Sequence, residues 1–270
     1  MGEGHAQSPG LLHEQVGGVL RLTIDRPEKR NALTDDDVAA LIDAIEGAGT
    51  DETVRAVVLS GTGEHFCSGF DIVSRNVPGG GRPRVGSIQR RMPSQANRLI
   101  SLMVRTQVPI VCVVRGWAAG IGLSLALAAD LTIAADDAMF WAPFLGRGFT
   151  PDSGSTWMLP RRIGEVRARD MLLLGRVVSG REAAQWSMIH AATDPADLAA
   201  EAGVLIDRLS AAPTVALGLT KFLLDSSSSS SLEAQLQDEA FSLELSSRSE
   251  DFKEGLLAFT EKRDPDFKGR

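Results

Sequence analysis

One stretch of the chain, residues 116–130, restricts the possible fold more than any other. It follows an apolar, β-branched run at 109–114 and passes from glycines into leucines and alanines at helical spacing. This pattern predicts a strand, a tight turn and a buried helix. Such a turn directs backbone N–H groups and the positive end of a helix dipole at one place, where an anion or a developing negative charge is stabilised. Small residues that only let a helix pack closely on a sheet explain the stretch equally well.

Composition narrows the class of protein. The 270 residues are enough for one large α/β domain, or for a domain with a smaller appendage. No apolar run approaches the roughly 18 residues that a membrane span requires, so we expect no membrane partner. The first ten residues lack a secretory signal and two cysteines cannot form a disulfide framework, so we expect a cytoplasmic protein. A net charge of −7 argues against a nucleic-acid partner and favours a small molecule.

Strand and helix patterns alternate through the first part of the chain. Apolar runs predict strands at 19–24, 54–59, 109–114 and 131–134, and we expect residues 1–15 to be a loose tail. Thr34 is placed to cap a helix whose first turn holds three aspartates, and a second helix is predicted over 95–105. Gly, Pro and Arg dominate 75–93, which predicts a mobile loop. The alternation indicates a mostly parallel sheet.

The second part of the chain is mainly helical. Helices are predicted over 166–174, 180–187, 197–209, 214–224 and 232–246, and a run of six serines at 226–231 predicts a flexible joint between two of them. A change of composition near Pro195 divides the chain into a core, residues 1–195, and a C-terminal helical region, residues 196–270.

A second glycine turn, at 66–71, changes the interpretation of the first. Together the two turns resemble the paired signature of the crotonase superfamily, the enoyl-CoA hydratases and isomerases. Further segments resemble the family in the same order, at Arg26-Pro27, 31–33, 151–154 and 254–263, so the resemblance covers about residues 15–268. It implies an α/β fold, a spiral of ββα units followed by C-terminal helices that assemble as homotrimers or dimers of trimers.

The resemblance also implies an acyl-CoA substrate and an oxyanion hole. Two backbone N–H groups would bind the thioester oxygen, and by position in the motifs they belong to Phe70 and Ile121. Loss of one such donor costs about 3 kcal/mol of transition-state stabilisation. Relatives commonly have glycine where this chain has Ile121, although a backbone donor survives that change if its dihedral angles fit.

The proton chemistry departs from that of the usual hydratase. Hydration in the family uses two glutamates, and this chain has Ser124 and Phe144 at the expected positions. The segment around Asp152 instead resembles the enoyl-CoA isomerases in which an aspartate shuttles a proton, and a double-bond shift needs only one such base. If Trp141, Phe144 and Trp157 line the acyl pocket, they would desolvate Asp152 and raise its pKa.

Other interpretations of these residues stay open. Asp152 is also well placed to cap the helix that follows it, and the roles are compatible. A hydratase with a non-standard acid–base set and a non-catalytic acyl-CoA-binding protein are the alternatives. The family's dehalogenases need a histidine after the first glycine turn, and the chain has no histidine between His65 and His190. The cysteine spacing gives no metal motif, and the turns match no dinucleotide fingerprint, so we expect no permanently bound cofactor.

Contacts with coenzyme A are expected from two regions. Lys29, Arg30 and Ser68 lie in or beside motifs near the first glycine turn, where they could meet the phosphates. Phe259 and Lys262 could reach the nucleotide end from the same or a neighbouring subunit. A solvated charge or a helix-packing aromatic explains each of these except Ser68 equally well.

Overall fold

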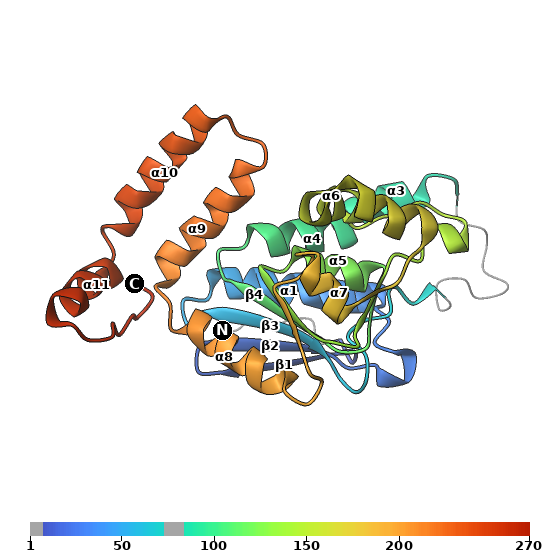
Figure 1. Ribbon diagram of the computed structural model, residues 1–270, viewed down its shortest axis with the longest axis horizontal. Helices are drawn as coiled ribbons and strands as arrows, with labels where there is room; N and C mark the ends of the chain where they lie inside the picture. Colours follow the sequence, from blue (N-terminus) through green and yellow to red (C-terminus); the bar gives the residue numbers. More distant parts are fainter. Residues whose placement is uncertain (1–7, 73–83) are drawn as a thin grey trace.

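The computed structural model describes residues 8–72 and 84–270 (Figure 1). One sheet has six strands in the order β1-β2-β3-β4-β6-β9, and a second has the order β5-β7-β8. In the larger sheet β1 and β2 pair antiparallel, and every other neighbouring pair is parallel. The strands are Leu11–Val16 (β1), Val19–Ile24 (β2), Ala56–Gly61 (β3), Ile110–Val114 (β4), Trp117–Ala119 (β5), Leu131–Ala135 (β6), Met139–Trp141 (β7), Val178–Ser179 (β8) and Ala191–Thr193 (β9).

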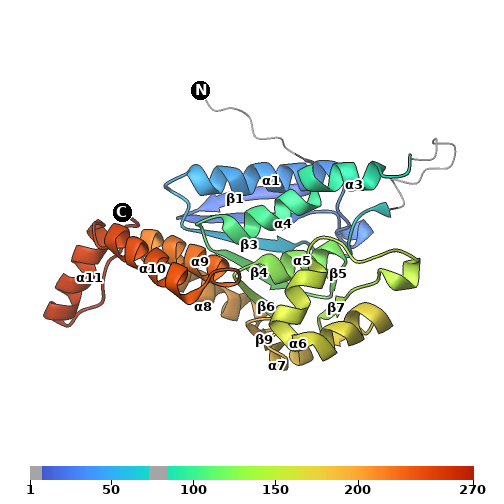
Figure 2. The ribbon, with the colours of Figure 1, turned by 90° about the horizontal axis from the view of Figure 1, so that it is seen from above.

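Helices cover the sheet and then continue beyond it (Figures 1 and 2). Their bounds are Asp35–Thr50 (α1), Ser87–Arg91 (α3), Ala96–Arg105 (α4), Ile121–Ala128 (α5), Ser155–Leu174 (α6), Gly180–Gln185 (α7), Leu198–Ser210 (α8), Thr214–Ser227 (α9), Leu232–Ser246 (α10) and Glu250–Glu261 (α11). Short 3₁₀ turns lie at Pro27–Lys29, Met92–Ser94 and Leu145–Arg147.

The chain repeats a strand–strand–helix pattern, and this confirms the predicted spiral of ββα units. β4 joins the larger sheet, β5 joins the smaller one, and α5 follows; β6, β7 and α6 repeat the sequence. After β3, Cys67 makes a parallel bridge to Ala118 of β5, so the segment after β3 also reaches the smaller sheet. Successive turns of the spiral therefore place their smaller-sheet segments side by side.

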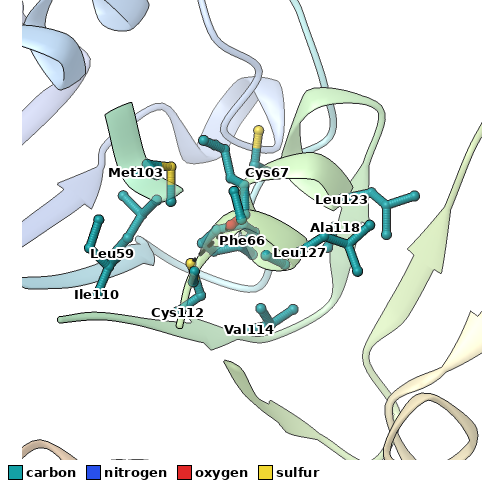
Figure 3. Close-up of a cluster of buried hydrophobic side chains, with 14 of the residues drawn as sticks. Leu59, Phe66, Cys67, Met103, Ile110, Cys112, Val114, Ala118, Leu123 and Leu127 are labelled. Atoms are coloured by element: carbon teal, nitrogen blue, oxygen red, sulfur yellow. Dashed lines mark hydrogen bonds between the residues drawn. The ribbon is translucent and has the colours of Figure 1, made fainter. Parts of the chain in front are cut away.

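The core lies where these units meet. Side chains of β3, β4, α4 and α5 pack around Phe66 and Cys67, which are both fully buried (Figure 3). Burying one large apolar side chain stabilises the fold by about 1.5–3 kcal/mol. The turn after β3 is consequently part of the core and is held from several sides.

The N-terminal part of α1 forms as predicted. Thr34 Oγ1 accepts from Asp37 N at 3.1 Å, and Asp37 Oδ2 accepts from Thr34 N at 2.8 Å, so the two residues cap each other. The reciprocal pair satisfies two of the backbone donors that a helix start leaves open. Acidic residues in this first turn also suit the helix dipole.

Several predicted elements were wrong or incomplete. Residues 11–16 form β1 instead of a loose tail; this edge strand is mostly exposed, so it has no alternating apolar pattern to detect. Residues 87–91 form α3 within the predicted loop, whose residues 75–83 lie outside the described part of the chain. α6 is broken at Gly164, whose φ and ψ are not helical; the part after the break agrees with the predicted helix over 166–174, and the part before it, from Ser155, was not predicted. The helix α11 and the short strands β5, β8 and β9 were not predicted.

The C-terminal helices project from the body of the molecule, with α10 and α11 farthest from the sheet (Figures 1 and 2). The serine-rich joint lies between α9 and α10 as predicted, although α9 includes the first two serines; its flexibility stays a prediction. α8, directly after the proposed division at residue 195, buries Leu198, Ala202 and Ile206 in the main core. That division stays a prediction.

Lys221 fastens α9 to the body. Its ammonium donates to the carbonyl oxygens of Met103 and Val108 at 2.9 and 3.3 Å, and to Asp130 Oδ2 at 2.7 Å. Met103 lies near the end of α4, and Asp130 follows α5. The cation thus satisfies groups at the negative ends of two helices.

Among the described residues, no single helix is long and apolar enough to cross a membrane; only α8 and α9 pass that test, as a pair bent by 103°. The same part of the chain contains no group of three or more potential metal ligands of the His, Cys, Asp and Glu types.

Candidate active site

The two glycine turns lie against each other. Cys67 N donates to Trp117 O, and Ala119 N donates to Cys67 O, both at 2.9 Å. A Cβ on Gly120 would be 3.7 Å from the Cα of Gly69, so the turns are in van der Waals contact. Gly69 and Gly120 both have positive φ, at 115° and 57°, which favours glycine. The backbones of Phe70 and Ile121, each one residue further on, are therefore brought together.

Gly122 is required by the approach of α5 to the other turn. A Cβ at this position would lie 2.3 Å from Cys67 O and 2.8 Å from Cys67 Cβ. Both atoms are buried and belong to the bridge that joins the turns. Close packing of backbone on backbone, which the sequence also suggested, is thus a real function of this stretch.

Gly122→Ala should destabilise the protein by about 1–3 kcal/mol, because the added methyl overfills a packed core. Gly203→Ala on α8 is the matched control, since a Cβ there meets nothing within 4 Å. The control should be neutral or stabilising by up to about 1 kcal/mol. Urea unfolding of both variants measures the difference, and equal unfolding free energies would contradict the packing argument.

The direction of the Phe70 N–H is set by a parallel bridge to Leu33. Leu33 N donates to Gly69 O at 2.9 Å, and Asp71 N donates to Leu33 O at 2.8 Å. In such a bridge the polar groups of the central residue point away from its partner. The Phe70 N–H therefore faces away from Leu33.

Ile121 is the first residue of α5, where backbone N–H groups have no partner within the helix. Within residues 8–72 and 84–270, no acceptor is recorded for the Ile121 N–H. Its φ is not positive, so a β-branched side chain fits at this position. The side chain is buried, and the backbone donor is kept.

The two positions expected for hydratase glutamates hold no acid. Ser124, one turn into α5, is completely buried, and its hydroxyl has no hydrogen-bond partner in the described structure. Phe144 is buried, and its ring meets Phe149 edge-on at 5.8 Å between centroids. Neither side chain can act as a carboxylate base.

Asp152 lies two residues before the N-cap of α6, which is Gly154. Its carbonyl oxygen accepts from the backbone N and the hydroxyl of Ser155 at 3.1 and 2.9 Å, so its main chain contacts the first turn. Its carboxylate accepts from Ser153 Oγ at 2.8 Å. Ser153 and Gly154 both have left-handed φ, which turns the chain sharply before the helix. The partly buried carboxyl group is thus presented ahead of the helix and not at its N-cap position.

The three aromatic residues expected near the acyl group have different surroundings. Trp141 packs against Trp117 at 5.7 Å and donates its indole N–H to Gly175 O. Trp157 is partly exposed beneath the Arg161 guanidinium, and it lines a cavity of about 270 Å³ with Asp130 and Lys221. A shared acyl pocket with Phe144 stays a prediction.

The proposed coenzyme A residues form two groups. Ser68 N and Oγ donate to the carbonyl oxygens of Arg30 and Lys29 at 3.0 and 3.3 Å, so these three residues adjoin the first glycine turn. The side chains of Lys29 and Arg30 are exposed. Phe259 is exposed on α11 and Lys262 follows that helix, far from α5 within one chain (Figure 1).

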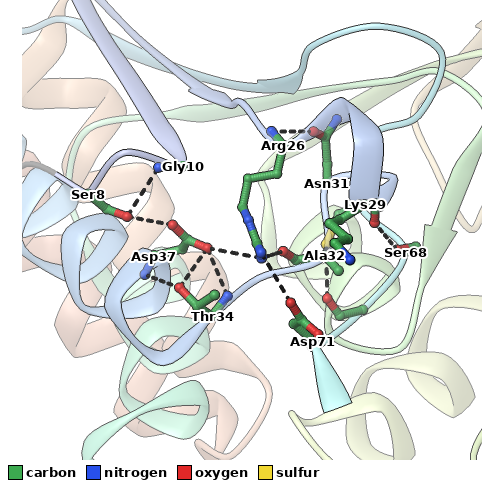
Figure 4. A network of polar contacts seen from close by, with 12 residues as sticks. Ser8, Gly10, Arg26, Lys29, Asn31, Ala32, Thr34, Asp37, Ser68 and Asp71 are labelled. Atoms are coloured by element: carbon green, nitrogen blue, oxygen red, sulfur yellow. Dashed lines mark hydrogen bonds and ion pairs between the residues drawn. The ribbon is translucent and has the colours of Figure 1, made fainter. Parts of the chain in front are cut away.

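In the sequence, Arg26 and Asn31 stand out only as parts of segments that resemble the family. Asn31 is buried with φ of 56°; its amide donates to the carbonyl oxygens of Thr62 and His65 and accepts from Arg26 N. Arg26 pairs with Asp71 and contacts Asp37 (Figure 4). The burial of Asn31 is visible only in the structure, so the family segment was the signal that the sequence offered.

Cys67 and Cys112 are free and buried, as the sequence suggested. Burial raises the pKa of the Cys67 thiol to about 12 from an ordinary 9.0, so its thiolate fraction at pH 8 should fall about a thousandfold. Ellman's reagent should therefore react slowly with native protein and fully after denaturation. Because the folded-state pKa is raised, the protein should also lose stability as pH rises from 9 toward 12. Rapid labelling of Cys67 in the native protein at pH 8 would contradict this.

Comparison with known proteins places this arrangement in context. A family model described as enoyl-CoA hydratase/isomerase matches residues 14–270. A protein of Escherichia coli K12 named 1,2-epoxyphenylacetyl-CoA isomerase is 39% identical over 96% of this chain and 98% of its own. A 4-chlorobenzoyl coenzyme A dehalogenase of an Arthrobacter species is 31% identical over 92% and 90%. The crystal structure of an enoyl-CoA hydratase from Polaromonas sp. JS666 has a TM-score of 0.88 at 30% identity, over 95% and 99% of the two chains.

Proposed function

The chain belongs to the enoyl-CoA hydratase/isomerase family, and on that premise we propose that it shifts a double bond in an acyl-CoA thioester, with Asp152 as the single acid–base. The protein is an enzyme of this crotonase type, and acyl-CoA thioesters are its class of substrate. One observation carries the finer proposal. The two glycine turns are in contact, which brings the backbones of Phe70 and Ile121 together, and Ser124 and Phe144 stand at the positions expected for a hydratase's glutamates.

The proposed mechanism uses one proton carrier. Asp152 takes a proton from a carbon of the acyl chain, and the electron pair of the broken C–H bond moves toward the thioester carbonyl. The resulting enolate oxygen is stabilised by the N–H groups of Phe70 and Ile121 and by the N-terminus of α5. Asp152 then returns the proton to a different carbon, so the double bond has moved and the atoms are unchanged.

A screen in deuterated water tests this function. The recombinant protein is incubated with unsaturated, aromatic and branched acyl-CoAs, and with a ring-epoxidised phenylacetyl-CoA such as the name of the E. coli relative suggests. Isomerisation leaves the mass of the thioester unchanged apart from exchanged deuterium, whereas hydration adds the mass of a water. Mass spectrometry distinguishes the two results, and a 3-hydroxyacyl product would replace the proposal with hydration.

Hydration is kept as the second candidate because the solved relative from Polaromonas is named a hydratase. It would need an acid–base set other than the usual glutamate pair. A non-catalytic acyl-CoA-binding protein would turn over no thioester in the screen. For dehalogenation, the chain still lacks a histidine between His65 and His190.

We propose a homotrimer, or a pair of trimers, as the working assembly in the cytoplasm. α9, α10 and α11 expose large apolar side chains that a lone chain leaves in water, among them Phe222, Leu236, Phe241, Leu256 and Phe259. Exposed apolar surface of this extent favours a protein interface. In such an assembly Phe259 and Lys262 would serve the coenzyme A site of a neighbouring subunit, and no permanently bound cofactor is proposed.

A further inference from the structure

Arg26 connects three separate segments near the first glycine turn. It lies between β2 and the Pro27–Lys29 turn, and its side chain is one-fifth exposed. Nη1 donates to Ala32 O at 2.5 Å, and Nη2 donates to Asp71 Oδ2 at 3.1 Å. Asp37 Oδ2 lies 3.8 Å from Nη1 (Figure 4). One guanidinium therefore meets α1, the segment after the 3₁₀ turn and the segment after Phe70.

These partners flank the bridge that orients Phe70. Ala32 directly precedes Leu33, and Asp71 directly follows Phe70, the two residues of the bridge. The backbone bonds from Leu33 N to Gly69 O and from Asp71 N to Leu33 O hold the bridge itself. We infer that Arg26 is a positioning residue, which holds the Phe70 N–H in the direction needed to bind the thioester oxygen; the inference rests on the proposed function.

Asp37, one of the acidic partners of Arg26, is held in place by several hydrogen bonds. Asp37 accepts from Thr34 N, Thr34 Oγ1 and Ser8 Oγ at 2.8, 2.8 and 2.5 Å, so its carboxylate is fixed to the start of α1. Both acidic partners are mostly buried: the side chain of Asp37 is 2% exposed and that of Asp71 is 10% exposed. The Arg26 charge compensates both carboxylates. Loss of the guanidinium would remove this compensation from both carboxylates.

The fork of the guanidinium matters as well as its charge. Arg26 uses separate nitrogens for Ala32 O and Asp71 Oδ2. A lysine ammonium supplies the charge from a single point and cannot reproduce the planar fork. Arg26→Lys should therefore keep the fold and the acidic partners compensated, but leave the segment after Phe70 less well fixed.

A misdirected oxyanion donor acts mainly on the transition state, because the carbonyl oxygen is most negative there. Complete loss of a donor costs about 10²–10³ in kcat, and we expect a loosened donor to cost about tenfold. Arg26→Lys should thus lower kcat about tenfold with KM within about twofold. A purely structural role would lower the amount of folded protein and leave kcat per folded molecule unchanged.

The experiment joins kinetics to a spectroscopic readout. The chromophoric thioester 4-(dimethylamino)cinnamoyl-CoA is bound to the wild type, to Arg26→Lys and to Asp71→Asn, and the absorbance shift that reports carbonyl polarisation is measured. Arg98→Lys is the control, since Arg98 pairs with Glu46 on the surface. Circular dichroism and thermal midpoints establish that each variant is folded. If Arg26→Lys does not fold, the isosteric variant Asp71→Asn alone tests whether Arg26 positions the Phe70 N–H.

A smaller absorbance shift and a lower kcat in Arg26→Lys or Asp71→Asn, with the control unchanged, support the inference. A full shift and a kcat within about twofold of wild type in the folded variants overturn it. A wild type that binds the probe without any shift overturns the proposed oxyanion hole as well. Failure of the inference and failure of the function therefore give different results.

Discussion

Asp152→Asn should reduce turnover of the isomerised thioester by about 10²–10⁴, the usual contribution of a positioned general acid–base. Asparagine keeps the size and most hydrogen bonds of aspartate, so the contact with Ser153 and the main-chain contacts with Ser155 should remain. It cannot take up a proton from carbon. Steady-state kinetics should show the loss in kcat, with the absorbance shift of the bound chromophoric thioester unchanged, because Phe70 and Ile121 are untouched.

The matched control is Asp207→Asn, an exposed aspartate on α8. It should keep wild-type turnover. Deuterium exchange into the substrate gives a second measurement, because exchange requires the same proton transfer. Exchange should fall together with kcat in Asp152→Asn. Wild-type kcat in this variant would rule out Asp152 as the base and would direct attention to another acid near the two turns.

The parts of the fold with strong local signals were predictable from sequence. The capping box of Thr34 and Asp37 and the apolar run of β4 are encoded within a few residues, and both lie where expected. β1 was missed because an exposed edge strand is held by backbone pairing and needs no apolar alternation. The part of α6 before Gly164 was missed because Pro160 lies within it and because the helix breaks at Gly164, where the backbone is not helical.

The candidate site, like the fold, was predictable from sequence only in part. Gly120 and Gly122 indicated a close approach of backbone, and the structure identifies the partner of Gly120 as Gly69 and that of Gly122 as Cys67. That partner is fifty-five residues away from Gly122 in sequence, and only the family resemblance related the two turns beforehand. The support beneath Phe70 could not be read from spacing, because Arg26, Leu33 and Asp71 meet only through tertiary structure.

Lys221→Met should lower the free energy of unfolding by about 3–5 kcal/mol, the usual effect of removing one partner of a buried ion pair. The Lys221 side chain is 8% exposed, and Asp130 and the carbonyl oxygens of Met103 and Val108 would lose their contacts with its ammonium. Burial already raises the pKa of Asp130 despite Lys221, and it lowers the pKa of Lys221. Urea unfolding at one fixed protomer concentration measures the loss, since assembly would add to apparent stability.

The pH dependence of this variant separates an ion pair from simple packing. A carboxyl whose folded-state pKa is raised favours the folded state below its unfolded pKa and loses that contribution as pH rises. Without Lys221 the pKa of Asp130 should rise further. The loss of unfolding free energy in Lys221→Met should therefore be largest near neutral pH and shrink as pH falls toward the ordinary aspartate value of 3.8.

Adding Asp130→Asn to Lys221→Met should recover part of this loss at neutral pH. A deficit that is independent of pH and unchanged by Asp130→Asn would mean that Lys221 acts through its alkyl chain alone. The recovery would instead show that charge fastens α9 to the ends of α4 and α5, the helix that carries the Ile121 donor.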